Sequence, residues 1–184
     1  MLTAAFFAPF IAMCARLDVS PVDLLSVACN ESRCSAEAHN PHGDASGLWQ
    51  LMPSTARGLG WNVDADPHLD AFRALGDVGQ LPWFEKYFAP HKGKLVSAAA
   101  CYVATFLPAL LAHAGDPSFV LCALGGPLEW AYKANKGFDT RGAGRITVSD
   151  LAAAIERASA AMGATWDGYL TFLTPTVDAD PSAS

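Results

Sequence analysis

The feature that most constrains the fold is a stretch of 21 residues, Leu95 to Gly115, without any charged side chain. A helix needs about 20 apolar residues to cross a bilayer, so this stretch is long enough for a membrane span. Pro108 interrupts this stretch, the small residues Ser97 to Ala100 lower its hydrophobicity, and polar side chains recur at Tyr102, Thr105 and His113. We therefore expect a helix over about 94–113 that is buried on all sides, with a membrane-active, holin-like protein as the alternative.

The N-terminal residues 1–15 are also apolar, as in secretory signal peptides. No Lys or Arg precedes the apolar run, however, and Pro9 interrupts it. We expect a packed N-terminal helix rather than a signal peptide. With the uncharged stretch buried as well, no stable membrane insertion is expected.

Composition favours helices for the rest of the chain. Ala and Leu far outnumber the β-branched Val and Ile that suit strands, so we predict an all-α, mainly helical fold. The 184 residues suit a single domain, placed at 1–175, with a flexible tail at 176–184. Gly137 and Gly163 are expected as left-handed C-caps. The predicted helices are about 21–33, Pro53 to Gly58 or Gly60, 67–75, 80–89, 94–113, 117–124, 127–136 and 149–162.

Charge and cysteine content exclude some partners. The net charge is −6 and the 12 Lys and Arg residues are scattered, which disfavours nucleic acid as a partner. The five cysteines show no C-x-x-C spacing, so they are interpreted as buried thiols, and a disulfide between Cys29 and Cys34 stays open. His39 and His42 belong to no metal-binding pattern. We expect neither a metal nor another cofactor.

The most informative geometry concerns Glu31. Ser20, Pro21 and Asp23 form a typical helix start, and from there Leu24, Val27, Ala28 and Glu31 fall on one helix face. A carboxyl group on an apolar face has a raised pKa, so it can hold a proton near neutral pH and serve as a general acid. A buried structural Glu, paired or hydrogen-bonded, is the alternative.

The residues from Glu31 to Ala56 carry a further pattern. Glu31-Ser32 stands at a helix end, followed in order by Asn40-Pro41, Gly47-Leu48-Trp49-Gln50, Met52-Pro53 and Thr55-Ala56. This series resembles the lytic transglycosylase (SLT) family, which shares its fold with goose-type lysozymes. The resemblance implies a lysozyme-like, SLT-type helical domain with a central buried helix.

The resemblance also implies roles for individual residues. Glu31 matches the single catalytic acid/base, and Ser32 matches the residue that helps to place the leaving group. Gly47 and Gln50 match the cleft wall that contacts the sugar, with Met52 beneath it.

Two tyrosines complete the expected site. The family's A-Y-N-A motif has a tyrosine that approaches the catalytic Glu, and Ala100 to Ala104 supplies Tyr102, with Val103 in place of the usual Asn. Tyr132 is a candidate for the late aromatic residue that closes the site, with core packing as its alternative.

The implied reaction is cleavage of the β-1,4 bond between N-acetylmuramic acid (MurNAc) and N-acetylglucosamine in peptidoglycan glycan strands, forming 1,6-anhydroMurNAc ends. Two alternatives remain. Asp44 could activate water in a muramidase, although an Asp in H-G-D-A-S-G is typical of a turn. The chain could also be a catalytically inert wall-binding or structural module.

Two later segments, Q-L-x-W-x-E-K-Y-F within Ala71 to Gly93 and N-x-G-x-D at 135–139, look like the phage and prophage branch of this family. That branch implies other phage tail or virion proteins as possible partners. It also implies synthesis in the bacterial cytoplasm and action at the cell wall or periplasm.

Residues 139–150 resemble the calcium loop of an EF-hand in degenerate form. Asp139, Gly144 and Asp150 occupy loop positions 1, 6 and 12, but Arg141 and Ala143 stand where oxygen ligands belong. We predict a loop that joins two helices and binds no calcium at micromolar concentrations.

Overall fold

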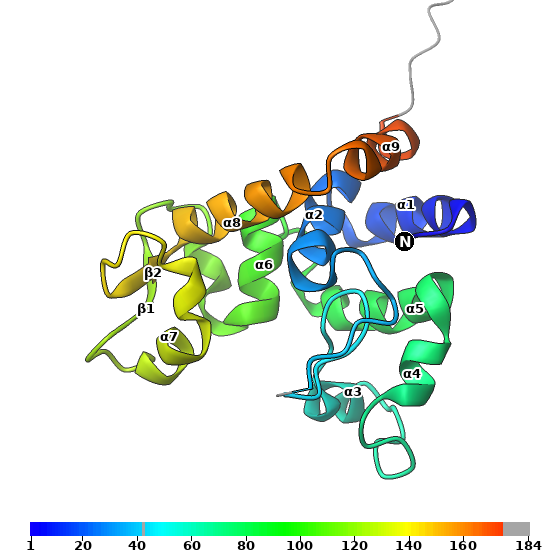
Figure 1. Cartoon of the computed structure of the whole chain (residues 1–184), viewed down its shortest axis with the longest axis horizontal. Coiled ribbons are helices and arrows are strands. Elements are labelled where there is room, and N and C mark those ends of the chain that lie inside the picture. Colours follow the sequence, from blue (N-terminus) through cyan, green and yellow to red (C-terminus); the bar gives the residue numbers. More distant parts are fainter. Residues whose placement is uncertain (42, 175–184) are drawn as a thin grey trace, which may run out of the picture.

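Helices dominate the computed structural model, which describes residues 1–41 and 43–174 (Figure 1). This confirms the predicted all-α fold class. The α-helices are α1 (Ala4–Leu17), α2 (Pro21–Ser32), α3 (Pro53–Gly58), α4 (Asp70–Ala74), α5 (Gly76–Phe88), α6 (Ala98–Phe106), α7 (Glu129–Asn135), α8 (Val148–Ala160) and α9 (Ala164–Leu173). The 3-10 helices are η1 (Ala89–His91), η2 (Pro108–His113) and η3 (Lys136–Phe138), and the strands are β1 (Val120–Ala123) and β2 (Arg145–Thr147).

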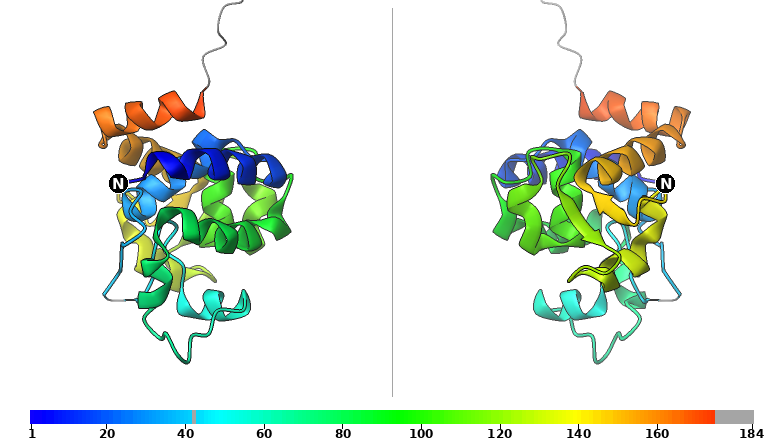
Figure 2. Two further views of the ribbon diagram at one scale, coloured as in Figure 1. Left: turned by 90° about the vertical axis from the view of Figure 1, so that its right-hand side faces the viewer. Right: turned by 90° about the vertical axis from the view of Figure 1, so that its left-hand side faces the viewer.

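The apolar N-terminal stretch forms the packed helix α1. Phe6 and Phe10 are fully buried, whereas Pro9 is exposed. Figure 2 shows α1 between α9 and α5, and it contacts both helices. Arg16 on α1 forms an ion pair with Glu85 on α5, with N–O distances of 2.6 and 2.8 Å.

The central helix α6 is buried as predicted, but it is shorter than the predicted 94–113. Ser97 caps its start by accepting a hydrogen bond from the Ala100 amide at 3.1 Å. It ends at Phe106 because Pro108 disfavours helical backbone at Leu107, which has φ −143° and ψ 71°. Residues 108–113 form η2 instead. Residues 99–104 are buried, and α6 packs against α2 and α8.

No single helix among the described residues has the length and apolar character to cross a membrane. In the part of the chain that the structure describes, α1 and α2 taken together are the one helix pair that reaches that length and composition, and they are bent by 113° at their junction.

Several other boundaries differ from the predictions. The helix predicted over 117–124 is wrong: Val120–Ala123 is a strand paired antiparallel with β2, with Cys122 opposite Ile146. The predicted helices 67–75 and 80–89 are α4 and α5. Neither glycine is the predicted left-handed C-cap: Gly137 lies inside η3, and Gly163, with φ 52° and ψ −131°, is the N-cap residue of α9. α9 was not predicted, and the tail predicted over 176–184 lies outside the described residues.

The loop between α7 and α8 is held by its own hydrogen bonds. The Asp139 carboxylate accepts bonds from the Ala143 and Gly144 amides at 2.8 and 2.7 Å. Asp150 accepts the Thr147 amide at 2.9 Å and pairs with Arg141 at 2.8 Å. Both acids that could bind a cation are therefore engaged. Within the described ranges, no three His, Cys, Asp or Glu side chains gather as a metal site.

Candidate active site

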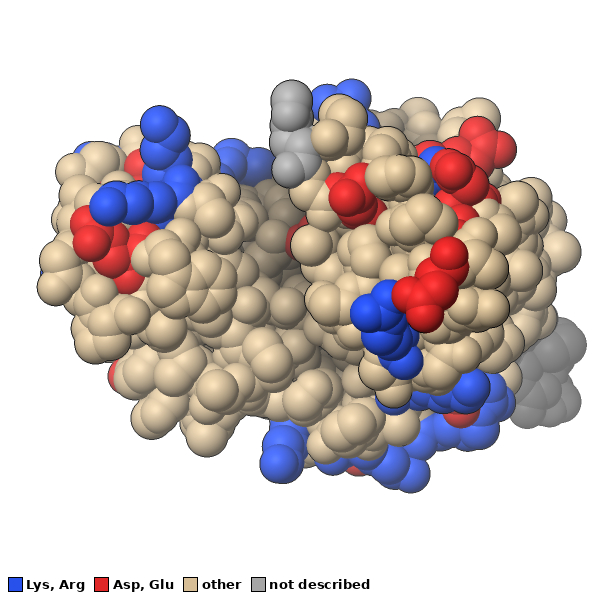
Figure 3. Space-filling model, turned by 90° about the horizontal axis from the view of Figure 1, so that it is seen from below, with Lys and Arg blue, Asp and Glu red and all other residues tan. Residues whose placement is uncertain are grey.

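A cleft of about 560 Å³ opens at the junction of α2, α5, α6, α7 and the loop before α3. Figure 3 shows, from below, a hollow between two parts of the surface, with mostly uncharged atoms around it. The cleft-lining residues that matter for the chemistry are Glu31, Gln50, Met52, Tyr87, Tyr102 and Trp130.

Glu31 lies in the last turn of α2, on the predicted face. Leu24, Val27 and Ala28 on that face are fully buried, and Glu31 is partly buried where the face meets the cleft. The helix begins as expected, because Ser20 accepts a hydrogen bond from the Asp23 amide at 3.3 Å. The helix therefore places one carboxyl group at the edge of the core.

Burial raises the pKa of Glu31, because the ionised form loses hydration. A hydrogen bond donated by the Tyr102 phenol opposes this shift, since it favours the carboxylate. In turn, burial and the Glu31 charge hold the pKa of Tyr102 well above its usual value. Burial and the same charge raise the pKa of Tyr87 to about 12, so both phenols stay protonated donors.

The structure thus brings Tyr102 to Glu31, as the sequence predicts. The Asn30 amide donates a second hydrogen bond to the Tyr102 phenol oxygen, which lowers its pKa. Val103, which stands in place of the family's Asn, is fully buried and does not line the cleft.

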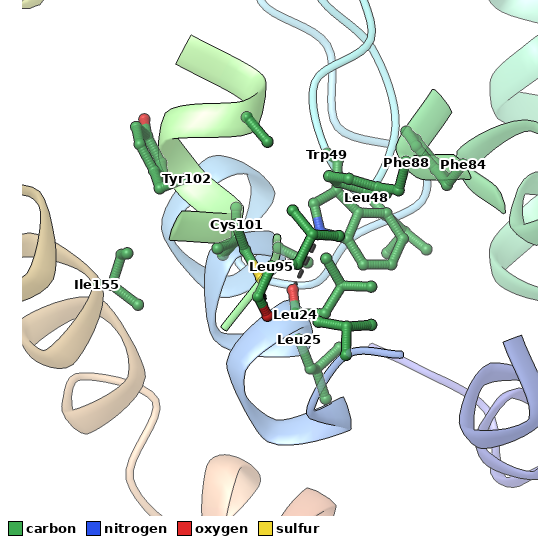
Figure 4. Close-up of a cluster of buried hydrophobic side chains, with 14 of the residues drawn as sticks. Leu24, Leu25, Leu48, Trp49, Phe84, Phe88, Leu95, Cys101, Tyr102 and Ile155 are labelled. Atoms are coloured by element: carbon green, nitrogen blue, oxygen red, sulfur yellow. Dashed lines mark hydrogen bonds between the residues drawn. The ribbon is translucent and has the colours of Figure 1, made fainter. Parts of the chain in front are cut away.

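The loop between α2 and α3 is fixed to both α2 and α5 by hydrogen bonds, two of which are buried. The Ser32 hydroxyl oxygen lies 2.8 Å from the Leu48 carbonyl oxygen, and the Trp49 indole donates to the Leu24 carbonyl at 3.1 Å. Gln80, fully buried on α5, accepts the Leu48 amide at 3.0 Å. Figure 4 shows the Trp49 indole against Phe84 and Phe88, while the Tyr102 ring extends away from this cluster. The loop therefore has a defined position relative to Glu31.

The predicted site residues other than Tyr132 divide into two groups. Gln50 and Met52 line the cleft together with Glu31 and Tyr102. Ser32 and Gly47 do not line it but position the loop.

Tyr132 is not brought to the cleft. Its hydroxyl donates to Asp139 at 2.9 Å, in the loop after α7. Trp130, on the same helix, lines the cleft instead, and 64% of its surface is exposed.

Three residues of the site were missed in the sequence. Gln80 shares a face of α5 with the buried Leu81 and Phe84, so the argument used for Glu31, a polar residue on an apolar helix face, could have found it. Tyr87 and Trp130 give no local signal, because only tertiary packing brings them to the cleft.

The Asp44 carboxylate lies away from the cleft and pairs with His68 at 3.1 Å. Asp44 has a positive φ of 57°, and its amide donates to the Asn40 carbonyl at 2.9 Å, which is typical of a turn. His39 lies 3.3 Å from Arg73, and His42 falls outside the described residues. Among the described residues that line the cleft, Glu31 is the single carboxylic acid.

Comparison with known proteins agrees with this geometry. Residues 9–72 match the family model of the transglycosylase SLT domain. The match includes Glu31, Gly47, Gln50 and Met52, and it supports the SLT family and a peptidoglycan-acting enzyme at that level. No curated protein and no solved structure matches the chain.

We predict that Gly47→Ala lowers the free energy of unfolding by about 3 kcal/mol. Gly47 has a φ of +78°, and an added Cβ would lie 2.5 Å from Gln80 Oε1. Gly60→Ala is a matched control, since Gly60 also has a positive φ but open space around it, and we expect a loss of about 1 kcal/mol. Urea denaturation measures both, and equal losses would contradict a steric role for the contact between Gly47 and Gln80.

Proposed function

We propose that this chain is a peptidoglycan lytic transglycosylase in which Glu31 is the only acid/base. It cleaves the β-1,4 bond between MurNAc and N-acetylglucosamine and leaves 1,6-anhydroMurNAc ends. The observation that carries the proposal is a single carboxyl group among the described residues of the cleft, with its pKa raised by burial and a phenol beside it.

In the first step, protonated Glu31 donates its proton to the glycosidic oxygen, and the bond between that oxygen and C1 of MurNAc breaks. Positive charge develops at C1, where the sugar's own 2-acetamido group stabilises it. Glu31 becomes a carboxylate, and the hydrogen bond from Tyr102 stabilises this charge.

In the second step, the Glu31 carboxylate accepts the proton of the sugar's 6-hydroxyl, and the 6-oxygen attacks C1. The 1,6-anhydro ring closes, and Glu31 regains the proton that it lost. No water is consumed, so the reaction needs no second carboxylate, unlike a two-acid glycosidase.

The place of synthesis and the place of action also form part of the proposal. The protein is made in the bacterial cytoplasm and acts on the cell wall or periplasm. Association with a phage virion or tail rests on the resemblance of two short segments alone.

Replacing the acid tests the mechanism. We expect Glu31→Gln to lower the rate of peptidoglycan cleavage roughly 1,000-fold, because the amide cannot donate or accept the proton. Glu156→Gln, at an exposed position on α8, is the matched control and keeps the wild-type rate. A zymogram ranks the variants, and mass spectrometry of the wild-type products identifies the ends.

Each alternative has its own outcome. Hydrated reducing ends would make the protein a muramidase and reject ring closure. Equal clearing by wild type and Glu31→Gln would remove the catalytic role of Glu31. An inert wall-binding module would clear nothing.

Trp130 gives a second prediction, since it offers a large exposed apolar face at the cleft. A sugar ring that covers about half of this side chain gains roughly 2 kcal/mol. We therefore expect Trp130→Ala to raise KM roughly 30-fold with a smaller effect on kcat. Trp130→Phe, which keeps an aromatic face, should recover most of the loss. A fall in kcat alone, with KM unchanged, would contradict a role in binding sugar.

A further inference from the structure

A second hollow, of about 410 Å³, adjoins the cleft. Ala134 and Asn135 line both hollows, so only the C-terminal end of α7 separates them. Asn30 on α2 and Arg157 on α8 form the other sides of the second hollow.

The second hollow is also linked to the acid/base. Asn30 directly precedes Glu31, and its amide hydrogen-bonds the Tyr102 phenol, which in turn hydrogen-bonds Glu31. A group bound beside Asn30 is therefore separated from the reacting atoms by one layer of side chains.

The polar groups around the second hollow suit an anion. Arg157 is exposed, and its guanidinium has no ion pair or hydrogen bond within residues 1–41 and 43–174. Asn30 and Asn135 line the same hollow, and none of its described lining residues is acidic. The Asn135 amide donates one hydrogen bond to the Ala131 carbonyl at 3.0 Å and the Asn30 amide donates one to Tyr102, but each amide nitrogen carries a second N–H. An arginine without a partner, beside amide donors, recognises a carboxylate by paired hydrogen bonds.

The substrate of the proposed reaction carries such a group. The peptide stem of peptidoglycan is attached through a lactyl ether at O3 of MurNAc, the sugar whose C1 reacts. Its first free carboxylate belongs to the D-isoglutamate that follows alanine. The lactyl and alanyl units together extend at most about 7 Å, the length of two residues. The stem can therefore leave the cleft and reach a neighbouring hollow.

We propose that the second hollow is a subsite for the peptide stem, in which Arg157 binds the isoglutamate carboxylate. The chain is then selective for stem-bearing glycan strands over bare ones. The subsite rests on the proposed function, because it needs MurNAc in the cleft.

The test compares two substrates and three proteins. The substrates are peptidoglycan strands with free isoglutamate stems and the same strands stripped by an N-acetylmuramoyl-L-alanine amidase. We expect the wild type to cleave stem-bearing strands roughly three to ten times faster. Arg157→Gln should bring this rate ratio close to one. Arg145→Gln is the matched control, since Arg145 is exposed on β2 outside both hollows, and it keeps the wild-type ratio.

A second substrate pair isolates the charge. Amidation of isoglutamate to isoglutamine keeps the size of the stem and removes its negative charge. Amidated strands should be cleaved by the wild type about as slowly as stripped strands.

The outcomes separate the two proposals. Equal rates on stem-bearing and stripped strands, or a ratio unchanged in Arg157→Gln, would overturn the subsite and leave the transglycosylase intact. Failure of the wild type to cleave either substrate would overturn the proposed function and the subsite with it.

Discussion

The cost of ionising Glu31 is the constraint on which the site depends. Its carboxyl group continues a helix face whose other members are fully buried, so the charged form loses hydration that only nearby donors can replace. Tyr102 supplies one donor, and Asn30 in turn donates to Tyr102. This balance leaves a carboxyl group that can give up a proton and take it back, which a single-acid reaction requires.

The packing of the rest of the fold fixes Tyr102 and the cleft-lining loop relative to Glu31. α6 is uncharged because it is packed between α2 and α8, and this packing brings Tyr102 to the end of α2. The loop opposite is fixed by three polar side chains, Ser32, Trp49 and Gln80, each bonded to backbone. These bonds fix the part of the loop that lines the cleft relative to Glu31.

Local signals in the sequence predicted the central part of the site. The cap at Ser20 and the spacing from Leu24 to Glu31 depend only on one helix, and both are confirmed by the structure. α6 ends before the apolar run does, because Pro108 disfavours helical backbone at Leu107 and this local effect overrides the apolar pattern. β1 forms because it pairs with β2, and Trp130 reaches the cleft because of how α7 packs. Neither contact is contained in a local sequence pattern. Tyr132 is an aromatic residue of the expected type, but its hydroxyl donates a hydrogen bond to Asp139 and it does not line the cleft.

The pKa of Glu31 tests the account most directly. It can be measured by NMR titration of protein labelled with ¹³C at glutamate, with Glu31→Gln to assign the signal. We expect a pKa above the ordinary value of about 4.3. We also expect a further rise in Tyr102→Phe, because that variant loses a hydrogen bond that favours the carboxylate. A pKa at or below the ordinary value, or one unmoved by Tyr102→Phe, would show that burial and Tyr102 do not control the ionisation of Glu31.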